Sequence, residues 1–420
     1  MANNRIIRNF SVTLQPVKIK GMMRRIVLLT VLAAAVTLGM AQKKELGQAR
    51  SYIKSGKDLD KAERLMTDLL KDAANRENKR IYETWFDAVH AQYAAANEKL
   101  YLKQQYDTAA FFGLTRRMYA IAETLDSLDM RPDEKGRVKP DFRKSHAEML
   151  DLLRPNLYNG GTYHVVKNHH AVAYDFFDTY LDACRQPLFS AYDYAKSDTR
   201  LPQAAYWATF CGYKLQDAER TLRYCELALK DVSKAQYTMQ YMCEAYQLLH
   251  RDADYVDLLH QGFERFPLNP YFFPRLADHY TAVNRPDSVL VIADEGLKAN
   301  ATHTLFLLAK SLALLELDRY DACIEVSQQL ININGQLPEP YFNIATVYLN
   351  QALELEKRNN PRQYRQQLQD LYASARPYME DYRRLQPDDQ QRWAPALYRI
   401  YLNLNMGRQF EEIDRLMRKQ

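Results

Sequence analysis

The chain has 420 residues, of which 47% are hydrophobic, with 57 Lys and Arg against 52 Asp and Glu. This hydrophobic content excludes a chain that is disordered by composition. Six basic residues and no acidic residue fall within residues 1–41, which leaves 51 basic against 52 acidic residues in the remainder. That near-balance excludes the clustered positive charge that a nucleic-acid-binding surface needs, so no nucleic-acid partner is expected.

The first segment, residues 1–41, has the layout of a secretory leader. Arg24 and Arg25 precede an apolar run over residues 26–38, and small residues lead to Gln42. A basic start, a short apolar core and small residues before a cleavage point are typical of a signal peptide. The pattern predicts translation from Met22 and cleavage after Ala41, with residues 1–21 upstream of the natural start.

The apolar run of the leader is shorter than the roughly 20 residues that a membrane-spanning helix needs. We therefore expect export across an inner membrane to the periplasm, with no stable membrane span after cleavage. The chain has five cysteines, an odd number without a Cys-x-x-Cys pair, which does not indicate a disulfide framework. Whether any two of them are oxidised is left open.

The remainder of the chain favours helices. Glycine is scarce, with 13 residues, and no long run alternates β-branched with polar residues, so almost no sheet is expected. The sequence predicts helical hairpins of divergent repeats over 42–129, a linker over 130–145 rich in Pro and Gly, a repeat array over 146–387, and a capping hairpin over 388–420. Insertions are expected near 187–200 and 353–369.

A constant period runs through the array. One column late in the second helix of each pair holds Ala228, Gly262, Gly296 and Leu330, which are equally spaced. A second column with the same spacing holds only small residues, namely Thr209, Cys243, Ala277, Ser311 and Ala345. Small residues at a fixed interval indicate that a neighbouring helix passes close by. A single helix pair cannot bury its apolar side, so the pairs must stack.

This pattern resembles the tetratricopeptide repeat (TPR), whose period of about 34 residues equals the spacing of both columns. The best copies of its small and large positions lie in "YFNIATVY" (341–348) and in the segment 156–181. The resemblance implies an all-α fold, a right-handed superhelical solenoid of antiparallel helix pairs. It also implies that the first helix of each pair lines a concave groove that binds a protein or peptide.

Carried onto this sequence, the resemblance places a binding groove at positions rich in aromatic residues. Aromatic side chains serve as binding anchors because they bury a large area and Tyr and Trp keep a polar tip. The same rings could instead pack in the core, and the sequence leaves that open. The groove positions are Tyr158, Asn159, Tyr206, Trp207, Phe210, Tyr213, Tyr237, Tyr241, Arg275, Asp278, Phe342 and Asn343.

No motif for catalysis or for a cofactor was found, so no catalytic residue, metal or cofactor is assigned. The nearest to a metal site is a group of three histidines, His164, His169 and His170, whose spacing does not match a helical zinc motif. The favoured function is an exported scaffold that binds a protein or peptide. The alternatives are a carbohydrate-binding protein or metal-dependent envelope enzyme that uses the same groove, and a structural spacer without a ligand. The oligomeric state is not predicted.

Overall fold

The structure is a computed structural model that describes residues 42–132, 135–358 and 361–418. Within these ranges all regular elements are helices and there is no strand, as the sequence predicted. No helix in these ranges is long and apolar enough to cross a bilayer. The leader and its cleavage point lie outside the described residues. The chain divides into two compact units at Asp231 and Val232, and each unit is described by itself.

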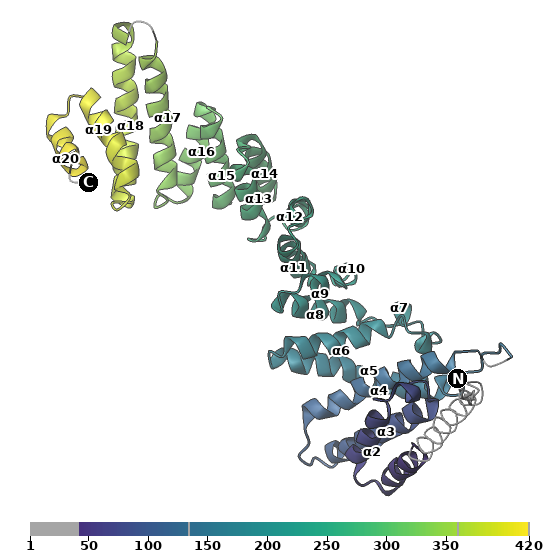
Figure 1. Cartoon of the computed structure of the whole chain (residues 1–420). Helices are drawn as coiled ribbons and strands as arrows, with labels where there is room; N and C mark the ends of the chain where they lie inside the picture. The colour runs from purple at the N-terminus through teal and green to yellow at the C-terminus, as the bar shows by residue number, and fades with distance from the viewer. Residues whose placement is uncertain (1–41, 133–134, 359–360, 419–420) are drawn as a thin grey trace, which may run out of the picture. The chain divides into compact units, whose positions relative to one another are not determined.

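The first unit is a stack of helix pairs in which each helix packs on the next one along the chain (Figure 1). It begins with a helix over residues 42–55. The following elements are α2 (Leu59–Leu69), η1 (Ala73–Asn75), α3 (Lys79–Tyr101), α4 (Thr108–Asp129), α5 (Arg143–Val166), α6 (His170–Asp182), η2 (Pro187–Phe189), α7 (Tyr194–Ser197), α8 (Leu201–Lys214), α9 (Ala218–Leu222) and α10 (Cys225–Ala228).

Within its described residues, 232–358 and 361–418, the second unit contains five further helix pairs. The elements are α11 (Ala235–Leu248), α12 (Asp252–Arg265), α13 (Phe272–Ala282), α14 (Pro286–Ala299), α15 (Thr304–Glu316), α16 (Tyr320–Ile333), α17 (Glu339–Glu356), η3 (Pro361–Tyr364), α18 (Arg365–Leu385), α19 (Gln390–Asn403) and α20 (Gly407–Met417). Only one side of α20 is apolar, and it packs on α19, so the end of the stack presents polar side chains.

The turns inside the pairs recur with the period found in the sequence. The residues with left-handed backbone conformation include Gln216, His250, Asn284 and Asp318, each one repeat period after the last. In each case the next N–H donates to a carbonyl five residues earlier, for example from Arg285 to Tyr280 at 2.8 Å. This bond satisfies a carbonyl that the end of the first helix leaves without an intrahelical partner. The helix-turn-helix unit of the sequence prediction is thus confirmed at the level of individual turns.

The columns of small residues lie at the contacts between successive helices. Thr209, Cys243, Ser311 and Ala345 are fully buried, and Ala277 is half-buried. Ala228, Gly262, Gly296 and Leu330 are also buried. At Gly262 and Gly296 the next helix pair leaves no room even for a β-carbon, whereas Leu330 fills the same position of its repeat with a larger side chain.

The segment 130–145 joins α4 and α5, which pack on each other. The carboxylate of Asp129 accepts hydrogen bonds from the backbone N–H groups of Asp141 and Phe142, at 2.6 and 3.0 Å. Arg143 pairs with Asp126 through two bonds of 2.7 Å. Acidic side chains of α4 thus hold the end of this loop against the start of α5.

Two parts of the stack differ in length from their neighbours. Residues 187–200 form η2 and α7 between the helices α6 and α8. In the second unit α17, with 18 residues, and α18, with 21, are the two longest helices among the described residues, and η3 lies between them. The second helix of the pair that begins with α8 is divided into α9 and α10, and the hydroxyl of Tyr224 at that break donates to Asp178 at 2.7 Å.

Candidate functional site

In the first unit, α8 carries the densest group of aromatic residues that the sequence singled out. Trp207, Phe210 and Tyr213 are half-buried, and Tyr206 is buried, with 7% of its surface exposed. The ring of Trp207 meets those of Tyr206 and Phe210 edge-on, at 5.2 and 5.6 Å between centroids. Lys214 lies 5.5 Å from the ring centres of both Phe210 and Tyr213. Three of the four rings therefore retain some open surface, whereas Tyr206 belongs to the core.

Two further expected groove residues lie on α5. Tyr158 is half-buried, and its ring lies edge-on to those of Phe177 and Tyr180, at 5.8 and 6.0 Å. Burial raises the pKa of Tyr158, while a hydrogen bond from Trp207 acts in the opposite direction. Asn159 is exposed. Tyr158 and Trp207 are thus brought together on neighbouring helix pairs of this unit.

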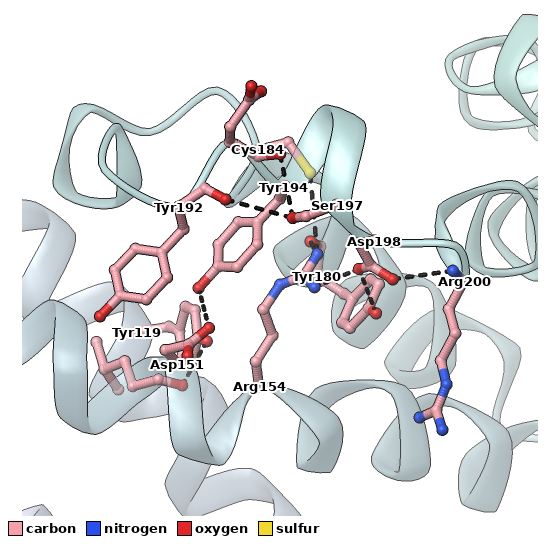
Figure 2. Close-up of polar contacts among 12 residues, drawn as sticks. Tyr119, Asp151, Arg154, Tyr180, Cys184, Tyr192, Tyr194, Ser197, Asp198 and Arg200 are labelled. Atoms are coloured by element: carbon pink, nitrogen blue, oxygen red, sulfur yellow. Dashed lines mark hydrogen bonds and ion pairs between the residues drawn. The ribbon is translucent and has the colours of Figure 1, made fainter.

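A buried polar cluster fastens the 187–200 insertion to this part of the stack (Figure 2). Arg154 of α5 forms an ion pair with Asp198 and lies between the rings of Tyr180 and Tyr194, at 3.8 and 4.0 Å. The hydroxyl of Tyr180 also donates to Asp198, at 2.6 Å. Tyr194 donates to Asp151 at 2.7 Å. Most of the polar groups satisfy one another inside the protein, so the cluster is a structural clamp.

Burial and hydrogen bonding act in opposite directions on the pKa of Asp198 in this cluster. Desolvation raises the pKa of Asp198, but the hydrogen bonds from Tyr180 and Arg154 outweigh it and leave that pKa below its usual value. Asp198 is therefore charged and matches the buried guanidinium.

The second unit contains an open cleft of about 800 Å³. It lies between α11, the loop that joins α12 to α13, the start of α13 and the end of α14. Among the large hydrophobic side chains that line it, Tyr237 and Leu268 are exposed, at 40% and 53%. The lining residues are Gln236, Tyr237, Gln240, Phe266, Pro267, Leu268, Asn269, Pro270, Tyr271, Arg275 and Ala299.

Two of the expected groove residues line this cleft, Tyr237 and Arg275. Two others lie outside its lining: Tyr241 is half-buried on α11, and Asp278 is exposed on α13. The two expected residues that line the cleft thus lie on the helices α11 and α13. None of the expected residues lies on the loop that joins α12 to α13.

The α12–α13 loop supplies the part of the cleft that the sequence analysis missed. Asn269 donates to Gln236 at 2.8 Å and accepts from Gln240 at 3.2 Å, which joins the loop to α11. The sequence contains a signal for this loop. Its "FPLNPY" (266–271) places apolar residues around two prolines.

Arg275 is held at one end of the cleft. Its guanidinium lies 3.6 Å from the ring centre of Tyr271 and 3.7 Å from the carboxylate of Glu244. The hydroxyl of Tyr271 donates to the same carboxylate at 2.8 Å. Burial is the largest of the causes that raise the pKa of Tyr271, so this hydroxyl stays protonated and holds Glu244 in place.

The remaining expected positions, Phe342 and Asn343, lie on α17. Asn343 is buried, with 3% exposed, and donates to the hydroxyl of Ser311 at 3.0 Å. Phe342 is half-buried against Tyr382, with the guanidinium of Arg392 3.8 Å from its ring centre. Asn343 and Tyr206 are thus corrections to the expected groove, because both side chains face packed neighbours.

The three histidines do not converge on a common point. His164 is buried, and its Nδ1 lies 3.5 Å from Nδ1 of His169. His170 instead packs edge-on to Phe210 at 5.7 Å. The part of the chain that the structure describes contains no group of three or more His, Cys, Asp or Glu residues placed to hold a metal ion.

The structure consists of stacked antiparallel helix pairs that recur at a constant interval. The chain therefore has a TPR-like helical fold. Neither the family models nor the curated proteins contain a match to this sequence.

The solved structures that the chain resembles include TPR proteins. One is the C-terminal part of a TPR repeat-containing protein from Cytophaga hutchinsonii, with 10% identity, a TM-score of 0.41, and coverage of 61% of this chain and 92% of that one. Another is YrrB, a TPR protein described as having an unusual peptide-binding site, with 13% identity, a TM-score of 0.33, and coverage of 46% and 90%. A third is yeast Tom70, with 13% identity, a TM-score of 0.33, and coverage of 87% and 89%.

Proposed function

We propose that the protein is an exported scaffold that binds a protein or peptide partner in the cleft of its second unit. The observation that carries the proposal is the cleft itself. An opening of about 800 Å³ has the size of a specific binding site, and its walls combine apolar surface with a few polar groups. No part of this proposal requires a bound cofactor.

The cleft has the features of a protein-binding surface. Tyr237 and Leu268 present exposed apolar area next to the rings of Phe266 and Tyr271. Aromatic and Arg side chains are the residue types most enriched at binding hot spots. The loop is tied to α11 through Asn269, so the cleft is formed before a partner arrives, which lowers the entropic cost of binding.

The half-buried rings of α8 offer a second, smaller contact surface in the first unit. Trp207, Phe210 and Tyr213 expose part of their area, and Lys214 adds a cation beside two of them. We assign this surface a supporting role, since its rings are half-buried, whereas Tyr237 of the cleft is 40% exposed.

Site-specific photocrosslinking in the producing cell tests the proposal. A photoreactive amino acid at Leu268 should capture a partner on irradiation. The same group at Val291, which is 57% exposed on α14 and outside the cleft, is the matched control. The additional change Tyr237→Ala should weaken the capture at Leu268. No capture from Leu268, or the same captured proteins from Val291, would overturn the proposal.

A further inference from the structure

We propose that the last three helices of the second unit bind the phosphate of an anionic phospholipid headgroup and thereby hold the protein at a membrane surface. The headgroup site is a cavity of about 350 Å³ between the first two turns of α18 and the turn that joins α19 to α20. This cavity shares no lining residue with the cleft beside α11, so the inference does not depend on the proposed function.

The cavity follows from the length of α18. This helix has 21 residues and the next helix, α19, has 14, a difference of about 10 Å at 1.5 Å per residue. The start of α18 therefore projects past the turn between α19 and α20 (Figure 1). The side chains at the start of α18 lie beside that turn, and the cavity lies between the two.

Three polar side chains that line the cavity have no partner within the described protein. The side chains of Arg365, Gln369 and Asn405 form no hydrogen bond or ion pair with any residue that the structure describes. Arg365 and Gln369 are four apart on α18, so they lie on the same face of that helix. Asn405 comes from the facing turn, where its backbone is left-handed. Together they offer a guanidinium and two amide NH₂ groups, the kinds of donor that a phosphate accepts.

The other polar side chains of the cavity are already paired. The hydroxyl of Tyr372 donates to Glu356 at 2.5 Å and accepts from Arg399 at 2.9 Å. Arg399 in turn forms an ion pair with Glu356 at 2.6 Å. Asn403 donates to the backbone carbonyl of Arg399 at 2.9 Å. The carboxylate of Glu356 is thus neutralised by Arg399 and leaves the charge of Arg365 uncompensated.

The edge of the stack that carries the cavity is basic. Residues 357–369 contain four basic residues and no acidic residue, and residues 390–410 contain three basic residues and no acidic residue. The next acidic residue on α18, Asp370, accepts a hydrogen bond from Gln366 at 3.0 Å. A cluster of four or more Lys and Arg is typical of a surface that binds anionic lipids. Among the described residues, the basic side chains that are exposed here and form no ion pair are Lys357, Arg358, Arg365 and Arg408.

Leu402 distinguishes a bilayer from other sources of phosphate. Its side chain is 52% exposed and lines the same cavity. At a bilayer surface an apolar side chain enters the boundary between headgroups and acyl chains, while basic side chains reach the phosphates. A nucleic acid or a dissolved phosphate ester would leave Leu402 in water. An exposed leucine among unpaired basic groups therefore favours a lipid.

Vesicle flotation of the purified mature protein tests the inference. Wild-type protein should bind vesicles made of equal parts of phosphatidylglycerol and phosphatidylethanolamine. It should bind vesicles of phosphatidylcholine at least about tenfold more weakly, because that headgroup has no net negative charge. Glycerol phosphate and a single-stranded oligonucleotide serve as soluble sources of phosphate. Neither should displace the protein from the anionic vesicles when its phosphate concentration equals that of the accessible lipid.

The variants assign the contacts. Arg365→Gln should weaken binding to the anionic vesicles about fivefold, the effect of one basic residue at such a surface. Gln369→Met leaves the charge unchanged and should also weaken binding about fivefold, because a headgroup in the cavity loses a hydrogen bond. Leu402→Ser should have a similar effect through the lost apolar contact. Arg80→Gln removes the same charge from an exposed arginine in the first turn of α3, and this matched control should bind like the wild type.

The inference is overturned if wild-type protein binds neither kind of vesicle or both equally. It is also overturned if Gln369→Met and Leu402→Ser bind like the wild type, or if Arg80→Gln weakens binding as much as Arg365→Gln. Displacement by glycerol phosphate or by the oligonucleotide would assign the cavity to a soluble phosphate ester or to a nucleic acid instead. Photocrosslinking at Leu268 tests a different part of the unit, so either proposal can fail without the other.

Discussion

A β-carbon placed on Gly262 would lie 2.3 Å from Cε1 of Phe272, a distance that no pair of non-bonded carbon atoms can adopt. The relationship recurs one repeat later, where a β-carbon on Gly296 would lie 2.8 Å from the ring of Phe306. Both phenylalanines are fully buried at the start of the next helix pair. The glycines are therefore the small partners of large rings, and the two positions determine how closely successive pairs approach.

Gly262→Ala should consequently destabilise the second unit by about 1–3 kcal/mol, the usual cost of overpacking a close contact. Gly113→Ala is the control, because Gly113 lies inside α4 with no atom within 4 Å of its added methyl group. There the higher helix propensity of alanine should stabilise by up to about 1 kcal/mol. Chemical denaturation of both variants gives the comparison, and equal changes in free energy of unfolding would contradict the packing argument.

The ion pair between Arg154 and Asp198 supports a second prediction about stability. Removing one partner of a buried pair leaves an uncompensated charge, so Arg154→Ala should cost about 3–5 kcal/mol. The exposed pair between Arg131 and Glu77 provides the matched control, and Arg131→Ala should cost less than about 1 kcal/mol.

Limited proteolysis would locate the effect of Arg154→Ala. If the clamp fastens the insertion, the variant should be cleaved within residues 187–200 sooner than the wild type. Cleavage elsewhere with the insertion intact would mean that Arg154 acts through another contact.

The repeat period was sufficient to predict the helix pairs, because it reflects contacts between neighbours that every repeat must make. The buried columns at Cys243 and Ser311 follow from that rule. The hydrogen bonds that hold the loop between α4 and α5 could not be predicted in this way. Proline and glycine show where a helix stops, but hydrogen bonds such as those from Asp141 to Asp129 decide whether the loop is free.

The cleft was predicted only in part, for a related reason. The repeat pattern points to positions on first helices and so found Tyr237 and Arg275. It carries no information on which turn of such a helix faces an opening, and Tyr206 and Asn343 lie at similar positions but are buried. The loop residue Asn269 lies outside the period, and its role depends on a backbone N–H whose direction only the fold determines.

The leader leads to a prediction about the mature chain. If residues up to Ala41 form a signal peptide, the exported protein should begin at Gln42, which intact-mass measurement or N-terminal sequencing would show. Ala41→Phe should retain the leader on the protein, since the cleavage point requires small residues. A mature chain of unchanged length in that variant, or one that begins elsewhere, would contradict the assignment.

The stability of the folded protein should depend on pH through Glu123, whose carboxylate lies between α4 and α6. Glu123 lines a small pocket with Asp178 and Asp182, and its Oε1 is buried without a hydrogen-bond partner among the described groups. Burial, followed by the charges of Asp182 and Asp178, raises the pKa of Glu123 to about 7. The folded protein therefore keeps a proton that the unfolded chain releases near pH 4.5.

Proton linkage determines whether stability rises or falls with pH. Between about pH 4.5 and 7 the folded state binds more protons at this site, so the contribution of Glu123 to stability falls as the pH rises, and it is constant above that window. Glu123→Gln should remove this slope and raise the melting temperature at neutral pH more than at pH 4.5. Glu98→Gln, at an exposed position on α3, is the control. Equal shifts for both variants at both pH values would mean that Glu123 is not held protonated in the folded chain.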